Sequence, residues 1–122
     1  MVSIRTLFAV CTILTFAAFP LYAQYVEIYR VDNLANELGE EAALGKVAAH
    51  LSVSADSLRQ EKKEYGITLG QVYFAHQLAK FTKSDSKAVM KEFQSGKAWG
   101  VLAKEKNLNM DDLRKDSRQL ED

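Results

Sequence analysis

Polar and apolar positions along this chain follow a helical period from residue 33 onward, in short runs separated by polar turns. The runs are rich in Ala, Leu, Glu, Lys and Gln, which favour helices, and the single proline lies upstream at position 20. Residues 25–31 differ, because Val26 and Ile28 alternate with Glu27, and whether they form a strand or a helix stays open. The pattern predicts an all-α chain with helices over residues 33–51, broken at Gly39, and over 55–65, 69–81, 85–95, 98–107 and 110–119.

Residues suited to capping stand at the starts of these segments, because their side-chain oxygens can accept the unpaired N–H groups of a first helical turn. The expected N-caps are Ser54, Thr68, Ser84 and Asn109. Thr68 has Gln71 three residues later, which is the spacing of a capping box. Gly66 and Gly96 suit the left-handed residue that closes a helix.

The helices repeat in pairs. Four positions recur at a constant offset of 55, with Gly45, Ala48, Val53 and Leu58 matched by Gly100, Ala103, Leu108 and Leu113. A middle copy begins at Leu69-Gly70 and reaches its closing apolar residue, Val89, 19 positions after the glycine instead of 13, which predicts a longer first helix. The sequence therefore predicts a compact bundle of three tandem helix-turn-helix units, each too small to bury its apolar face alone.

The spacing within a unit gives each repeated residue a task. We expect Ala48 to lie where the two helices cross, Val53 to fill the turn, and Leu58 to pack back onto the first helix. Each such buried apolar side chain contributes roughly 1.5–3 kcal/mol. The predicted organisation is an N-terminal export segment over residues 1–23, an arm and first helix over 24–43, and a repeat domain over 44–122. The units of the repeat domain lie near 44–66, 69–96 and 99–120.

The first 23 residues are typical of an export signal. Arg5 precedes an apolar run over residues 7–19, and Ala23 offers a cleavage site before Gln24. We expect a periplasmic or secreted protein with no stable membrane span after processing. The residue at position −3 would be Leu21, where a small side chain is usual, so retention of the segment as a membrane anchor stays open.

Processing would also remove Cys11, the only cysteine. The mature chain would then have no disulfide, no thiol nucleophile and no cysteine-bound zinc. Its 15 basic residues against 16 acidic ones give a net charge near −1. Such a balance offers no field to attract nucleic acid or anionic lipid, so nucleic acid is not an expected partner.

Histidines are the remaining candidates for chemistry. Neither His50 nor His76 has a second histidine or a carboxylate at i+3 or i+4, so we expect no metal, cofactor or catalytic site. Glu64 or Asp85 could meet one of them in space, but a histidine beside apolar helix positions is more often a core residue bonded to backbone. An enzyme would need a cleft in which His50 or His76 meets a carboxylate.

Aromatic residues gather in and beside the middle unit, and three of them are candidate binding residues: Trp99, Tyr65 and Tyr73. In a groove between units, these rings could stack on a sugar or hold an apolar peptide or a lipid tail. The alternative is that they form the core. Trp99 favours the core, because it has the same repeat position as Leu44 and Leu69.

Two local resemblances cover about twenty residues each. Residues 103–113 resemble the core of a DNA-binding helix-turn-helix, although Asp111 and Asp112 would face the phosphates. Ser95-Gly96 with Trp99, Leu102, Ala103, Leu108 and Leu113 resembles the helical part of a lysin motif, the peptidoglycan-binding module, without its flanking strands. The Ser-Gly-Lys-x-Trp-Gly phrase and the repeats also resemble small exported bacterial helical-repeat proteins of unassigned function.

The expected function follows from these exclusions. We expect an exported, small helical binding or assembly protein without catalytic activity, whose partner is a protein or a component of the cell envelope. Peptidoglycan binding is one alternative, implied by the lysin-motif resemblance. DNA binding is another, for the case in which the signal is not used.

Overall fold

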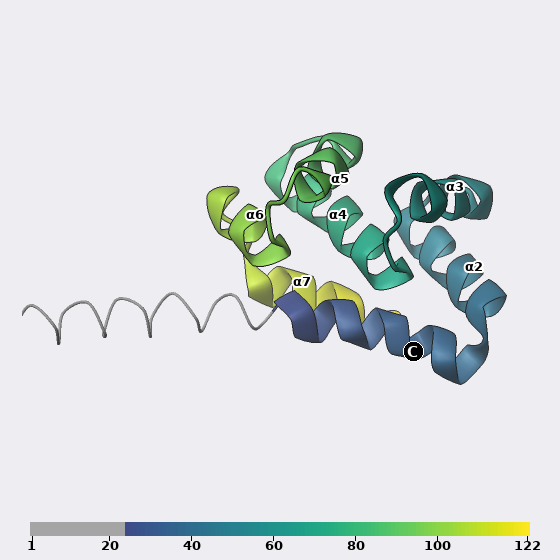
Figure 1. Ribbon diagram of the computed structural model, residues 1–122. Coiled ribbons are helices and arrows are strands. Elements are labelled where there is room, and N and C mark those ends of the chain that lie inside the picture. The colour runs from purple at the N-terminus through teal and green to yellow at the C-terminus, as the bar shows by residue number, and fades with distance from the viewer. Residues whose placement is uncertain (1–23) are drawn as a thin grey trace, which may run out of the picture.

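Residues 24–122 are described by a computed structural model, and they form seven helices and no strand (Figure 1). The expected export signal lies outside the described residues. Helix 24–38 comes first and lies along the last helix of the chain (Figure 1). The other helices are α2 (Glu40–Leu51), α3 (Ala55–Tyr65), α4 (Leu69–Thr82), α5 (Ser86–Gln94), α6 (Trp99–Glu105) and α7 (Met110–Arg118). The all-α bundle is confirmed, and none of these helices is long and apolar enough to cross a bilayer.

The segment over residues 25–31 is helical, which answers the question that its alternating pattern left open. Ile28, Val31 and Leu34 are buried, and this spacing of three places them on one side of a helix. Val26, which the alternation would have placed with Ile28, is exposed. Gly39, at φ 89°, separates this helix from α2 at the predicted break.

Three of the four expected N-caps are confirmed. The side chains of Ser54, Thr68 and Asn109 accept first-turn N–H groups, and Thr68 and Gln71 form the reciprocal capping box. Ser84 was the wrong choice, because Asp85 caps α5 by accepting from the N–H of Ala88. The Ser84 N–H instead donates to the carbonyl of Ala79 at 2.8 Å, so Ser84 belongs to the turn that closes α4.

The repeat appears as one backbone turn in all three helix pairs. Ser52 and Asn107, 55 positions apart, both have φ 57°, and Lys83 has φ 55° in the middle pair. In each pair, the N–H after this left-handed residue donates to a carbonyl five positions earlier, at 3.0 Å for Val53, 2.8 Å for Ser84 and 2.9 Å for Leu108. The middle pair has the longer first helix, as α4 has 14 residues against 12 in α2 and 7 in α6.

Helix α4 lies at the centre of the bundle (Figure 1), and nine of its residues are buried. Helix 24–38 crosses its start at Gly70. A Cβ at Gly70 would lie 2.1 Å from the carbonyl oxygen of Ile28, so only glycine allows this approach. Asp32 accepts from the Gly70 N–H at 2.6 Å and from the Thr68 hydroxyl at 2.9 Å, which places a carboxylate at the positive end of α4.

Candidate functional site

The three candidate aromatic residues, Trp99, Tyr65 and Tyr73, lie in the hydrophobic core. Trp99 is 1% exposed, stacks on Phe93 at 4.3 Å between ring centroids, and meets Phe74 edge-on at 5.4 Å. These contacts are those expected for the core alternative. None of the three rings faces open solvent in this structure.

A cluster of polar side chains joins α2, α4 and α7 around Asp116. One oxygen of this carboxylate accepts from His50 Nε2 at 2.5 Å, from the Tyr73 hydroxyl at 2.8 Å and from the Gln77 amide. Burial, followed by the hydrogen bond to Asp116, raises the pKa of Tyr73. Asp116 therefore ties the last helix pair to the other two.

The second histidine makes a similar pair one helix away. His76 on α4 lies 2.8 Å from a carboxylate oxygen of Glu61 on α3, and Glu61 is buried. The expectation that these histidines bond to backbone was wrong, since both meet side-chain carboxylates. The acids are Asp116 and Glu61, and not the suggested Glu64 or Asp85.

His50 and His76 also line one small cavity. It has a volume of about 310 Å³, and its remaining lining residues are Leu51, Ser52, Gln77 and Lys80. A carboxylate behind a histidine fixes the orientation of the ring and its tautomer, which is the arrangement used in acid–base catalysis. Each histidine meets a carboxylate, but neither Asp116 nor Glu61 lines the cavity itself, and the expected lack of catalysis stays a prediction. Residues 24–122 contain no group of three or more metal-ligating side chains.

Sequence reasoning missed Glu61 and Asp116, although the repeat carried a signal for them. Each stands seven positions after its N-cap, Ser54 or Asn109, and Glu92 stands seven positions after Asp85 in the middle pair. Each acid reaches a basic residue or histidine beyond its own helix. The pairs are Glu61 with His76, Glu92 with Lys97 and Lys106, and Asp116 with His50.

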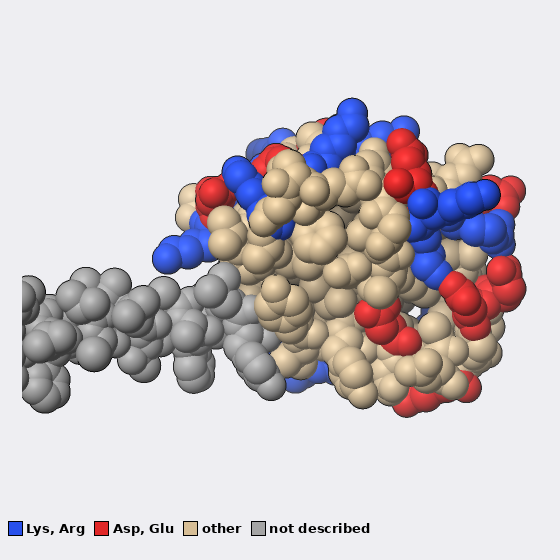
Figure 2. All heavy atoms as spheres, in the orientation of Figure 1, with Lys and Arg blue, Asp and Glu red and all other residues tan. Residues whose placement is uncertain are grey.

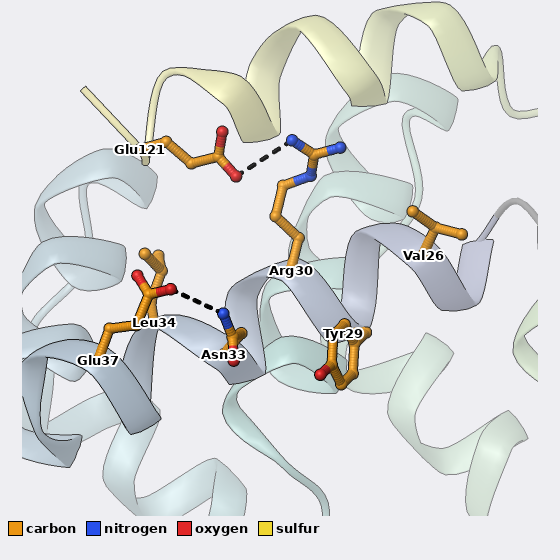
Figure 3. Close-up of a pocket in the computed structure, with 7 residues that line it drawn as sticks. All are labelled: Val26, Tyr29, Arg30, Asn33, Leu34, Glu37 and Glu121. Atoms are coloured by element: carbon orange, nitrogen blue, oxygen red, sulfur yellow. Dashed lines mark hydrogen bonds and ion pairs between the residues drawn. The ribbon is translucent and has the colours of Figure 1, made fainter.

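A larger groove lies between helix 24–38 and the C-terminal end of the chain (Figure 3). Its volume is about 470 Å³, and its lining residues are Val26, Tyr29, Arg30, Asn33, Leu34, Glu37 and Glu121. Arg30 reaches across to Glu121 at 3.1 Å, and Asn33 donates to Glu37 at 2.9 Å (Figure 3). The groove thus offers apolar surface near residue 26 and hydrogen-bonding groups near residue 37.

Exposed apolar surface is concentrated on the same helix. The large hydrophobic side chains that are exposed within residues 24–122 are Tyr25, Val26, Tyr29, Leu38 and Val101. All except Val101 belong to helix 24–38. Figure 2 shows side chains of both signs along the upper and right-hand parts of the face in view, with a broad uncharged area in the middle. Comparison with protein-family models, with curated proteins and with solved structures finds no match to this chain.

Proposed function

We propose that the chain is an exported binding or assembly protein without catalytic activity, and that helix 24–38 provides its binding surface. The observation that carries this proposal is the gathering of exposed apolar side chains beside the groove in Figure 3. Apolar surface concentrated on one element of a small domain is typical of a contact with a partner.

The two histidine–carboxylate pairs, His50 with Asp116 and His76 with Glu61, are better explained by a structural role than by a catalytic one. Asp116, on α7, accepts hydrogen bonds from side chains of α2 and α4, so its position is set by packing between units. Glu61 likewise joins α3 to α4. Both carboxylates are engaged in holding the bundle together.

The two alternative functions, DNA binding and peptidoglycan binding, have less support from the structure. The start of α7, where a DNA-reading helix would meet phosphates, has the exposed carboxylates of Asp111 and Asp112. In the first pair, Arg59 is bonded to Asp56 and to Glu41. A lysin motif requires strands beside its helix pair, and residues 24–122 have none.

Site-specific photo-crosslinking in cells that produce the protein tests the binding surface. We expect a crosslinker at Asn33 or Glu37, in the groove, to give an adduct of one defined mass that excess purified chain competes away. The control is Lys87, an exposed residue of α5, and Figure 1 shows this helix away from helix 24–38. Equal adducts from all three positions, or none from the groove, would contradict the proposal.

Export is tested separately. N-terminal sequencing of the protein from an extracytoplasmic fraction should begin at Gln24. Recovery of intact Met1 from the cytosol would contradict export and return DNA binding to consideration.

A further inference from the structure

The end of helix 24–38 that begins at residue 24 exposes large apolar side chains and no charged one. Of residues 24–29, the exposed ones are Tyr25, Val26 and Tyr29, at 49%, 44% and 69%. The one charged residue among the six, Glu27, is 2% exposed. Ser117 donates to its carboxylate, and Arg30 lies 3.3 Å from it. This end of the helix therefore meets its surroundings only with aromatic and aliphatic groups.

The same helix becomes polar along its length. Beyond Tyr29, Arg30, Asn33 and Glu37 line the groove in Figure 3, and Leu38 at the far end of the helix is the one large apolar side chain exposed there. Residues 25 to 29 cover about 6 Å of helix axis, which is close to the thickness of one headgroup layer, about 5–8 Å. Tyrosine is enriched at this depth of a membrane, because its ring is apolar and its hydroxyl can reach water.

The sequence before residue 24 supplies the reason to choose lipid over other apolar partners. Residues 6–26 contain no charged residue, so the uncharged run that begins in the export segment ends among the exposed side chains of the helix. A chain held in a bilayer by that run would present Tyr25 and Val26 at the membrane boundary first.

We infer that the beginning of helix 24–38 is a lipid contact, with Tyr25, Val26 and Tyr29 in the headgroup layer while the N-terminal segment is attached. This inference rests on the proposed function and applies to the chain before processing: lipid headgroups are the envelope component that this surface contacts until the segment before Gln24 is removed. The contact is made by apolar and aromatic groups, so it requires no anionic lipid. Asn33 and Glu37 remain in water and stay open to a protein partner.

The test uses the full chain with Cys11→Ser and one new cysteine for a fluorophore, reconstituted in phosphatidylcholine vesicles whose headgroups carry a nitroxide quencher. The labelled positions are Tyr25→Cys, Tyr29→Cys, Glu37→Cys and Val101→Cys. Position 101 is the matched control, because Val101 is also an exposed aliphatic residue, at 39%, but lies on α6. We expect several-fold stronger quenching at 25 and 29 than at 37 and 101. Equal quenching at all four positions would overturn the inference.

A second set of variants tests whether quenching reflects only closeness to the N-terminal segment held in the vesicle. With the fluorophore at Asn33→Cys, the double change Tyr25→Asp and Tyr29→Asp should lower quenching several-fold, while Val101→Asp should leave it unchanged. Circular dichroism checks that helicity is kept, as expected for changes at exposed positions. No loss of quenching in the double variant would overturn the lipid contact. A groove crosslink without quenching would overturn only the lipid contact, and quenching without a crosslink would contradict only the protein-binding groove.

Discussion

The first and third helix pairs, residues 44–66 and 99–120, share one backbone turn and differ in what surrounds it. In both, a left-handed residue at φ 57° ends the first helix and a capped second helix follows. The first pair is built from helices of 12 and 11 residues, the third from helices of 7 and 9. Helices this short are marginal alone, so the third pair depends more on its neighbours.

Those neighbours are visible in the side chains at equivalent positions. Leu44 in the first pair corresponds to Trp99 in the third, which packs between Phe93 and Phe74. Glu61 accepts from His76 and Ser57, whereas Asp116 accepts from three residues of two other helices. A repeat can therefore preserve the turn between its two helices while the tertiary contacts of its copies diverge. Each third-pair substitution should cost more than its first-pair counterpart.

The largest difference is expected at the helix starts. Trp99→Ala removes a buried ring that contacts two aromatic neighbours and should lower the free energy of unfolding by roughly 3–5 kcal/mol. Leu44→Ala should cost less, toward the lower end of roughly 2–5 kcal/mol, because a smaller side chain is removed. Equilibrium urea unfolding measures both. A Trp99→Ala variant with wild-type stability would contradict the core position of this ring, and Trp99→Phe, which keeps an aromatic ring beside Phe93, is the milder control.

The acids seven positions after the N-caps give the next comparison. Asp116→Ala leaves several donors around α4 without an acceptor, and each buried unpaired group costs about 1–3 kcal/mol. We expect a loss of roughly 2–4 kcal/mol, against about 1–2 kcal/mol for Glu61→Ala, which serves one histidine and one hydroxyl. Thermal and urea unfolding of the two variants compare the losses. Equal losses would mean that Asp116 does not hold the units together.

How much of this architecture could be predicted depends on how local its cause is. The caps at Ser54, Thr68 and Asn109 arise from a few consecutive residues, and the sequence shows them. Ser84 failed because Asp85 is an equally good cap one residue later, and the choice between them depends on how α4 ends. The longer first helix of the middle pair could be counted directly from the glycine to Val89.

The site was harder to predict than the fold, because its contacts join distant parts of the chain. His50 and Asp116 are 66 positions apart, and no spacing within either helix pairs them. The alternation at Val26 and Ile28 covers too few residues to decide between a strand and a helix, whereas the buried face of helix 24–38 is defined by packing against other helices. The groove depends on where Glu121 lies after folding, which only the tertiary structure determines.

The helix crossings provide the third comparison. Ala48 and Ala103 are both buried, at 4% and 2% exposed, so a leucine at either position must displace neighbours. Ala48→Leu and Ala103→Leu should each lower the free energy of unfolding by roughly 1–3 kcal/mol. Ala103→Leu should lie at the upper end, because the short helices of the third pair depend more on their contacts with neighbouring helices. Urea unfolding measures both values, and wild-type stability in both variants would contradict the equivalence of the two corners.

Alkaline pH offers a smaller test of the bond between α4 and the third pair. Because the pKa of Tyr73 is raised in the folded state, its contribution is complete below the unfolded value, about 10, and is lost as the pH rises above it. The free energy of unfolding should fall by up to about 1.4 kcal/mol per pH unit there. Urea unfolding between neutral pH and the alkaline range should show a weaker decline in Tyr73→Phe, and an identical decline would assign the effect to other groups.

The smallest difference is expected at the N-caps. Asn109 accepts from the N–H groups of both Asp111 and Asp112, whereas Ser54 accepts from that of Ser57 alone. Removing a cap costs typically about 1 kcal/mol, so Asn109→Ala should lie somewhat above that value and Ser54→Ala at or below it. The carboxylates of Asp111 and Asp112 favour the same end of α7 through the helix dipole, and they partly compensate for the lost cap. Urea unfolding in low and high salt separates the contribution of the cap from that of the carboxylates, because salt screens the carboxylates while leaving the hydrogen bonds of the cap in place. A larger loss for Ser54→Ala than for Asn109→Ala at both salt concentrations would contradict the greater dependence of the third pair on each of its contacts.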